Sequence, residues 1–258
     1  MAKTNDYATL SFHVYNFDNT SIPEGWTQFL SSPDNNSYFG SSYINEKNKE
    51  IIIAHRGTEP SDTGDLVSDL QLALNFVPNQ YSDAITFVNT IKGYTKVGGI
   101  FEGYTKAHTG HSLGGVLAQL SAATFEEKAA TFDSTGTLEL MEELGISYST
   151  TDITSYVAAP NAINTTNTHI GDVVRIYNSP ILEPTAFGVV DEYPFYTLAQ
   201  HSIDQIVNQF NAITGEPTVY SVHSEWPSGG DDDSIDGGVG RDIINDNGVF
   251  LAAKFLIA

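Results

Sequence analysis

The apolar positions along the chain change repeatedly between helical and strand-like spacing. Helical spacing occurs near residues 7–15, 65–74, 82–95 and 112–125, whereas short apolar or alternating runs occur near residues 38–43, 51–54, 155–160 and 173–177. Amphipathic helices repeat about every 3.6 residues, and buried parallel strands form short continuous apolar runs. This order predicts an α/β fold with a mainly parallel sheet flanked by helices.

One turn between a predicted strand and a predicted helix carries a reactive residue type. Residues 109–115, Thr-Gly-His-Ser-Leu-Gly-Gly, contain the pattern Gly-x-Ser-x-Gly around Ser112, and an alanine-rich run follows. A nucleophilic serine on such a turn needs small neighbours, and the next helix directs its first N–H groups at the developing oxyanion. The pattern predicts that Ser112 is a nucleophile; the alternative is a glycine-rich turn with a surface serine.

A second segment strengthens this interpretation. Residues 50–59 form an apolar run that ends in Arg56-Gly57-Thr58. Alone, this ending would indicate only a turn after a strand. Together, the Ala-His-Arg-Gly-Thr and Thr-Gly-His-Ser-Leu-Gly-Gly segments resemble the class 3 lipase family, over roughly residues 5–210. The resemblance implies the α/β-hydrolase fold, with an oxyanion hole formed by Thr58 and the backbone N–H of Leu113.

The base and the acid must follow the serine, because α/β-hydrolases carry their triad in the order serine, acid, histidine. The resemblance implies Asp172 as the acid, since class 3 lipases carry their aspartate in a similar Gly-Asp-x-Val segment. An aspartate in a simple β-turn is the alternative for Asp172. Asp191 is a weaker candidate for the acid.

Three histidines follow the serine: His169, His201 and His223. His169 would precede the acid. His201 begins an amphipathic stretch and resembles the family's histidine at the start of a short helix, while His223 is the alternative base. The expected triad is therefore Ser112, Asp172 and His201.

The segment before the serine departs from the expected pattern. A strand that supports this turn should be apolar and buried, yet residues 101–109 include Lys106 and His108. Lysine and histidine are uncommon in a central parallel strand. We therefore expect a shortened or irregular strand there, with reduced stability and activity.

Composition limits the partners. The 258 residues include 11 Lys and Arg against 32 Asp and Glu, a formal net charge of −21. Such a charge excludes nucleic acid as a natural partner and gives no attraction to an anionic membrane. No run approaches the ~18 apolar residues of a membrane span. We expect an ester or lipid substrate, with lipid contacts that are apolar or bridged by calcium, and catalysis without a cofactor.

The C-terminal segment carries a different pattern. Residues 237–245 fit the nonapeptide Gly-Gly-x-Gly-x-Asp-x-U-x of RTX calcium repeats, and residues 228–236 are a degenerate copy. In such repeats, carboxylates and backbone carbonyls bind Ca²⁺ between stacked turns. The candidate calcium-binding residues are Asp233, Gly238, Gly240 and Asp242. Because stacks usually need at least three repeats, an acidic glycine-rich tail without tight binding is the alternative.

These features predict three segments. Residues 1–226 form the hydrolase domain, residues 227–248 form a short RTX-like β-roll, and residues 249–258 form an apolar ending that serves as a secretion signal or as a final strand. The chain has no cysteine, and its first residues lack the apolar core of a signal peptide. With the repeat tail, these features predict an extracellular protein exported by type I secretion.

The leading hypothesis is a secreted carboxylester hydrolase, either a triacylglycerol lipase or an esterase. Phospholipase A1 activity is one alternative. Another alternative is a calcium-dependent binding protein without catalysis, built on a hydrolase scaffold, and a third is an intracellular esterase with an incidental tail. Residues 59–79 are predicted to form a lid over the site or a plain packing helix.

Overall fold

The computed structural model describes residues 1–15, 17, 21–33, 38–57, 77–148, 152–158, 163–164, 166–176, 201, 203–208, 210 and 215. Several predictions lie outside these residues. They are the helix at 65–74, most of the lid segment, Asp191, His223, the repeat tail and the apolar ending.

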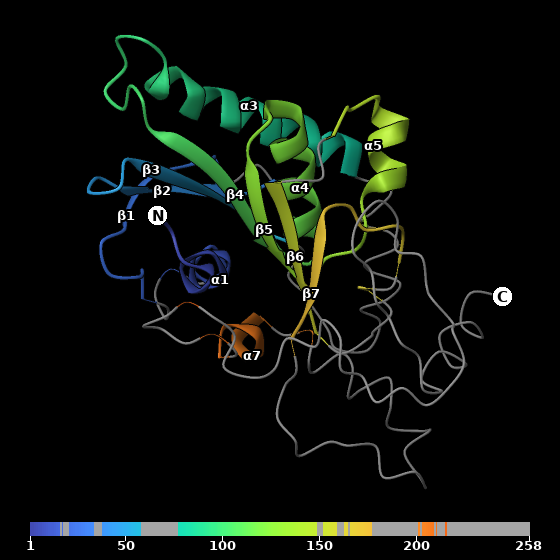
Figure 1. Ribbon diagram of the computed structural model, residues 1–258. Helices are drawn as coiled ribbons and strands as arrows, with labels where there is room; N and C mark the ends of the chain where they lie inside the picture. Colours follow the sequence, from blue (N-terminus) through green and yellow to red (C-terminus); the bar gives the residue numbers. More distant parts are fainter. Residues whose placement is uncertain are drawn as a thin grey trace, which may run out of the picture.

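A mixed sheet forms the centre of the described structure (Figure 1). Its seven strands lie side by side in chain order: β1 (Thr27–Ser31), β2 (Gly40–Asn45), β3 (Glu50–His55), β4 (Thr105–His111), β5 (Lys128–Phe132), β6 (Ile153–Val157) and β7 (Asp172–Arg175). The first three strands are antiparallel, and β3 to β7 are parallel. The prediction of a mainly parallel sheet is confirmed.

Helices cover both faces of this sheet (Figure 1). On one face lie α3 (Val77–Thr95), α4 (Leu113–Phe125) and α5 (Leu138–Leu144); on the other lie α1 (Thr4–His13) and α7 (Ile203–Val207). The apolar residues of β3 pack against helices on both faces of the sheet. Ile51 and Ile53 pack in the cluster that includes α3 and α4, whereas Ile52 and Ala54 pack in the cluster that includes α1. Successive strand residues point to opposite faces, so burial on both sides favours apolar residues throughout a strand.

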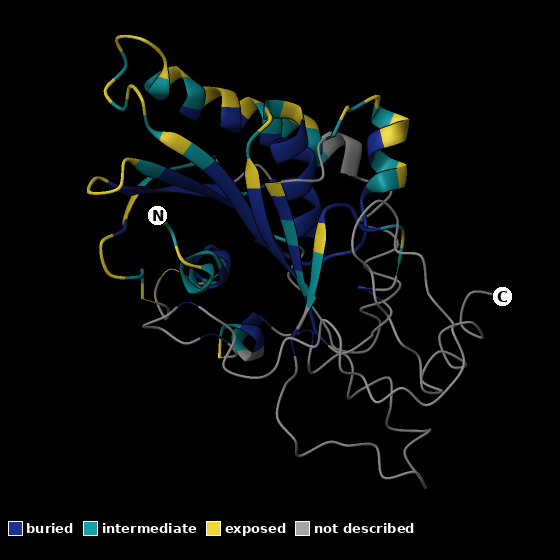
Figure 2. Cartoon of the chain, viewed as in Figure 1, coloured by how far each residue is buried: buried dark blue, intermediate teal, exposed yellow. Residues whose placement is uncertain are grey.

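The central strands and α4 are the most deeply buried elements (Figure 2). In α4, all residues from Leu113 to Ala123 are buried. Within the described residues, no helix is long and apolar enough to cross a membrane.

The expectation of an irregular strand before Ser112 is wrong. β4 pairs in continuous parallel register with β3 over Glu50–His55 and with β5 from Ala107 to His111. The polar residues that raised the doubt are satisfied inside the protein. Glu127 accepts from Nε2 of His108 at 2.9 Å and from Nζ of Lys106 at 3.0 Å. Buried polar groups of a regular strand are tolerated when each has a partner.

Candidate active site

Ser112 occupies a strained turn between β4 and α4. Its backbone has φ 56° and ψ −127°, which places a non-glycine residue at positive φ. Such conformations cost about 1–3 kcal/mol and persist only where the surroundings impose them. Here the N–H of Ser112 donates to the carbonyl of Phe132 in β5 at 3.0 Å. The turn has the geometry of a nucleophile elbow, and we use that name for residues 110–114.

The flanking glycines are required by contact. A Cβ on Gly110 would lie 2.2 Å from the carbonyl oxygen of Gly114, and a Cβ on Gly114 would lie 2.1 Å from the carbonyl oxygen of His55. No side chain fits at either position without moving backbone. The predicted reason for the Gly-x-Ser-x-Gly spacing is therefore confirmed.

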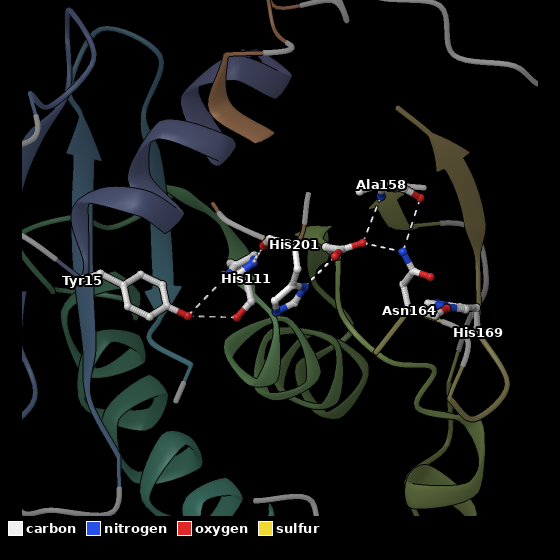
Figure 3. A network of polar contacts seen from close by, with 7 residues as sticks. Tyr15, His111, Ala158, Asn164, His169 and His201 are labelled. Carbon is white, nitrogen blue, oxygen red and sulfur yellow. Dashed lines mark hydrogen bonds and ion pairs between the residues drawn. The ribbon is translucent and has the colours of Figure 1, made fainter. Parts of the chain in front are cut away.

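His201 is held next to the elbow by a carboxylate. Its Nδ1 lies 2.5 Å from Oδ2 of Asp133, the residue that directly follows β5. Oδ1 of Asp133 accepts from the N–H of Ala158 at 2.9 Å and from Nδ2 of Asn164 at 2.6 Å. Asn164 is held in turn by His169, whose Nε2 donates to the Asn164 carbonyl at 2.8 Å (Figure 3).

Asp133 is suited to remain ionised although it is fully buried. Burial by itself would raise the pKa of its carboxyl group, but the hydrogen bond and the charge of His201, with the donors of Asn164 and Ala158, together lower that pKa below its usual value. An ionised carboxylate at Nδ1 keeps the proton on that nitrogen. Nε2 of His201 is then the basic nitrogen.

The prediction that Asp172 serves as the partner of His201 is wrong in this structure. Asp172 is exposed and is the first residue of β7, paired with Thr154 near the start of β6. Ser112 and Asp133 instead follow the carboxyl ends of β4 and β5. In a parallel sheet the first residues of the strands lie at one end of the sheet and the last residues lie at the other. Asp172 therefore lies at the opposite end of the sheet from Ser112 and Asp133.

Asp133 was missed although the sequence holds a signal for it. It comes directly after the short run Ala129-Ala130-Thr131-Phe132, the strand that follows the elbow helix. In α/β-sheets, functional residues gather beyond the carboxyl ends of neighbouring strands. A carboxylate that ends the next strand was therefore a better candidate than one that begins a later strand.

The elbow also contacts His201 through His111. Nε2 of His111 donates to the backbone carbonyl of His201 at 2.6 Å, and the two rings lie 4.5 Å apart. Among the described residues, no hydrogen bond joins Ser112 to His201. Catalytic hydrogen bonds are often long in unliganded sites and shorten when substrate binds.

Of the two expected oxyanion donors, the structure describes Leu113 but not Thr58. Leu113 is the first residue of α4, and the first N–H groups of a helix have no partner within it. Thr58 lies outside the described residues. Its neighbour Gly57 lies against the elbow, since a Cβ there would be 2.7 Å from the His111 carbonyl oxygen.

Over the part of the chain that the structure describes, no three His, Cys, Asp or Glu side chains gather as a metal site. The candidate calcium residues Asp233, Gly238, Gly240 and Asp242 lie outside that part.

Comparison with known proteins places this geometry in a family. Residues 6–159 match the Tle-like phospholipase domain of the phospholipase-like family. The chain belongs to this family. The matched range includes the elbow and Asp133, whereas His201 follows it.

A curated relative and solved structures extend the comparison. The chain is 34% identical over 156 residues to RP165, an uncharacterized protein of Rickettsia prowazekii (strain Madrid E). The match covers 53% of this chain and 42% of that protein. The chain thus spans less than half of that relative.

Two fungal structures are similar in fold. One is a fungal lipase from work on an unusual buried polar cluster in a family of fungal lipases. It has a TM-score of 0.50 and 17% identity, over 68% of this chain and 78% of that one. Lip2 lipase from Yarrowia lipolytica has a TM-score of 0.49 and 16% identity, over 70% and 80%. The first likeness shows that the phospholipase-like domain has a lipase-like α/β-hydrolase fold.

Proposed function

We propose that this phospholipase-like protein hydrolyses a carboxylic ester of a lipid by a serine mechanism. The observation that carries the proposal is the buried Asp133–His201 pair beside the strained Ser112. A serine hydroxyl is a weak nucleophile until a base takes its proton, and a histidine fixed by a carboxylate is the usual base.

The reaction then proceeds in two stages. Nε2 of His201 takes the hydroxyl proton while Ser112 Oγ attacks the ester carbonyl, and Asp133 stabilises the imidazolium that forms. The N–H of Leu113, with Thr58, stabilises the oxyanion. The imidazolium protonates the leaving alkoxide, and an acyl-enzyme remains. Water, deprotonated by His201, hydrolyses the acyl-enzyme and returns the serine.

The family favours an acyl ester of a glycerophospholipid as the substrate. A phospholipase A1 type of cleavage, at the sn-1 ester, fits the serine chemistry as well as the triacylglycerol or soluble-ester cleavage that the sequence led us to expect first.

The test compares wild type with Ser112→Ala. Hydrolysis is measured on p-nitrophenyl esters of short and long acyl chain, and on mixed micelles of diacyl phospholipid or triacylglycerol, each with calcium or with a chelator. We expect turnover by wild type only, with the phospholipid preferred. Equal inactivity of the two folded proteins would contradict the proposal and favour a binding role, whereas equal activity would contradict Ser112 as the nucleophile.

Calcium and export remain separate proposals. The repeat pattern around Asp233 and Asp242 supports a structural calcium site in the tail, and the same tail supports type I secretion to the medium. A chelator that lowers the melting temperature without changing the Ser112 chemistry would support the calcium site. Recovery of the protein from culture medium with an intact N-terminus would support export.

A further inference from the structure

The hydroxyl group of Tyr15 joins two backbone segments of the site. Tyr15 follows α1, and its Oη accepts from the N–H of Gly57 at 2.9 Å. The same Oη donates to the carbonyl of His111 at 3.2 Å (Figure 3). Gly57 directly precedes Thr58, and His111 directly precedes Ser112. One hydroxyl group therefore links Gly57 to the elbow, and we call residues 57–58 the oxyanion loop after the role proposed for Thr58.

The side chain of His111 extends the link to the base. A carbonyl oxygen can only accept, so the 2.6 Å contact with the His201 carbonyl requires a proton on Nε2 of His111. Nδ1 of the neutral ring is then an acceptor, and it lies 3.4 Å from Oη of Tyr15. The contacts thus fix the tautomer of His111.

We propose that Tyr15 and His111 are positioning residues that hold the oxyanion loop, the nucleophile elbow and the base in one hydrogen-bonded unit. This inference rests on the proposed ester hydrolysis. We call the pair the Tyr15–His111 brace. Neither residue contacts the reacting atoms in the mechanism above. Tyr15 acts through backbone groups next to Thr58 and Ser112, and His111 acts through the backbone carbonyl of His201.

The neutrality of His111 gives the brace a second role. Burial, and then the neighbouring His201, lower the pKa of His111 to about 3. His201 becomes an imidazolium during the reaction, and its ring is 4.5 Å from that of His111. A charged ring at that distance would oppose the charge that His201 must acquire. A buried, neutral His111 supports the backbone of His201 without this penalty.

Loss of the brace should therefore affect the transition state more than substrate binding. Without the Tyr15 hydroxyl, the N–H of Gly57 loses its partner and the segment that carries Thr58 is no longer held. Oxyanion donors act only when they are already in place, so small displacements lower kcat and leave KM nearly unchanged.

The chain offers a matched control for this change. Oη of Tyr43, in β2, bonds Nδ1 of His13, in α1, at 2.8 Å, and the Tyr43 side chain packs in the cluster that includes α1. Tyr43→Phe removes the same group, from a tyrosine–histidine hydrogen bond that does not include the elbow.

The experiment measures kcat, KM and melting temperature for wild type, Tyr15→Phe, Tyr43→Phe, His111→Leu and His111→Gln, with hydrogen exchange at the Gly57 amide. We expect kcat to fall about tenfold or more in Tyr15→Phe and His111→Leu, with KM changed less than twofold. The glutamine amide can donate to the His201 carbonyl, so His111→Gln should recover much of kcat. The Gly57 amide should exchange faster in Tyr15→Phe and not in Tyr43→Phe.

Two failures can be told apart. If wild type hydrolyses esters and Tyr15→Phe keeps the kcat and Gly57 exchange of Tyr43→Phe, the brace is wrong and the proposed function stands. If folded wild type hydrolyses no ester, the proposed function is wrong and the positioning role falls with it. A melting temperature lowered equally in all variants, with no difference in kcat, would also overturn the brace.

Discussion

Two hydrogen-bonded chains of the same composition occupy different places in this molecule. One, which we call the core chain, runs from Oη of Tyr38 to Nδ1 of His55 at 2.9 Å, from Nε2 of His55 to Nδ1 of His108 at 3.1 Å, and on to Glu127. The other, the site chain, consists of Tyr15, His111, His201 and Asp133. Each combines one tyrosine, two histidines and one carboxylate.

The two chains differ in whether a histidine ring nitrogen remains without a hydrogen bond to the described residues. In the core chain, both ring nitrogens of His55 and of His108 bond other side chains, and both residues are fully buried within strands. In the site chain, His201 bonds Asp133 through Nδ1, and Nε2 makes no hydrogen bond to the described residues. A carboxylate–histidine pair therefore indicates catalysis only where one ring nitrogen remains available beside a nucleophile.

The largest expected difference between the chains is in activity. Asp133→Asn should lower kcat for ester hydrolysis about 10⁴-fold, because the amide cannot hold the reactive tautomer of His201. Glu127→Gln, the equivalent change in the core chain, should leave kcat within about threefold, since Glu127 contacts no reacting group. Steady-state kinetics on one ester substrate compare them directly. Equal losses in both folded variants would show that position relative to the elbow does not matter.

Stability should separate a partly buried carboxylate from an exposed one. Glu127→Gln removes the charge that neutralises the partly buried Lys106, which should lower the free energy of unfolding by about 2 kcal/mol. The adjacent Glu126 is exposed, so Glu126→Gln should change it by less than about 0.5 kcal/mol. Urea titrations at neutral pH measure both. A Glu127 variant as stable as the control would mean that the core chain is dispensable.

The last comparison concerns the pH dependence of stability. Burial lowers the pKa of His55 well below its usual value, and burial with His201 lowers that of His111 to about 3. Below about pH 6.5 the unfolded chain binds protons that these folded histidines do not, so stability falls by about 1.4 kcal/mol per pH unit for each. The lowered carboxyl pKa values of Asp133 and Glu127 add a further loss near pH 4 and below.

The pH dependence of the free energy of unfolding can be divided into a share from His55 in the core chain and a share from His111 in the site chain. His111→Gln should flatten the loss of stability between pH 6.5 and about 5 by one histidine's share, whereas the share of His55 should remain. Urea unfolding of wild type and variant across this range tests the division. An unchanged slope in the variant would contradict a neutral His111.

The fold and the elbow at Ser112 followed from local sequence patterns, but the carboxylate that contacts His201 did not. Gly110, Ser112 and Gly114 are fixed by a turn whose requirements are local, so their spacing identified the elbow. The acid depends on which strand ends lie together. Asp172 matched a short motif, but the parallel order of β5, β6 and β7 places Asp133 at the correct edge.

The misjudged strand has a similar cause. Lys106 and His108 are unfavourable in a central strand when taken alone. Their partner Glu127 comes about twenty residues later, after the whole of α4, so sequence spacing gave no sign of it. The short strands β1 and β5 and the helix α5 were not predicted either, because brief segments carry little periodic signal.

The most direct test of the central claim is the rate at which a fluorophosphonate labels Ser112 in wild type, Asp133→Asn and Asp172→Asn. Ser112→Ala defines the background. The account predicts rapid labelling of wild type and of Asp172→Asn, and labelling of Asp133→Asn slowed by about three orders of magnitude or more. Slow labelling of folded Asp172→Asn, with wild-type labelling of Asp133→Asn, would contradict the account.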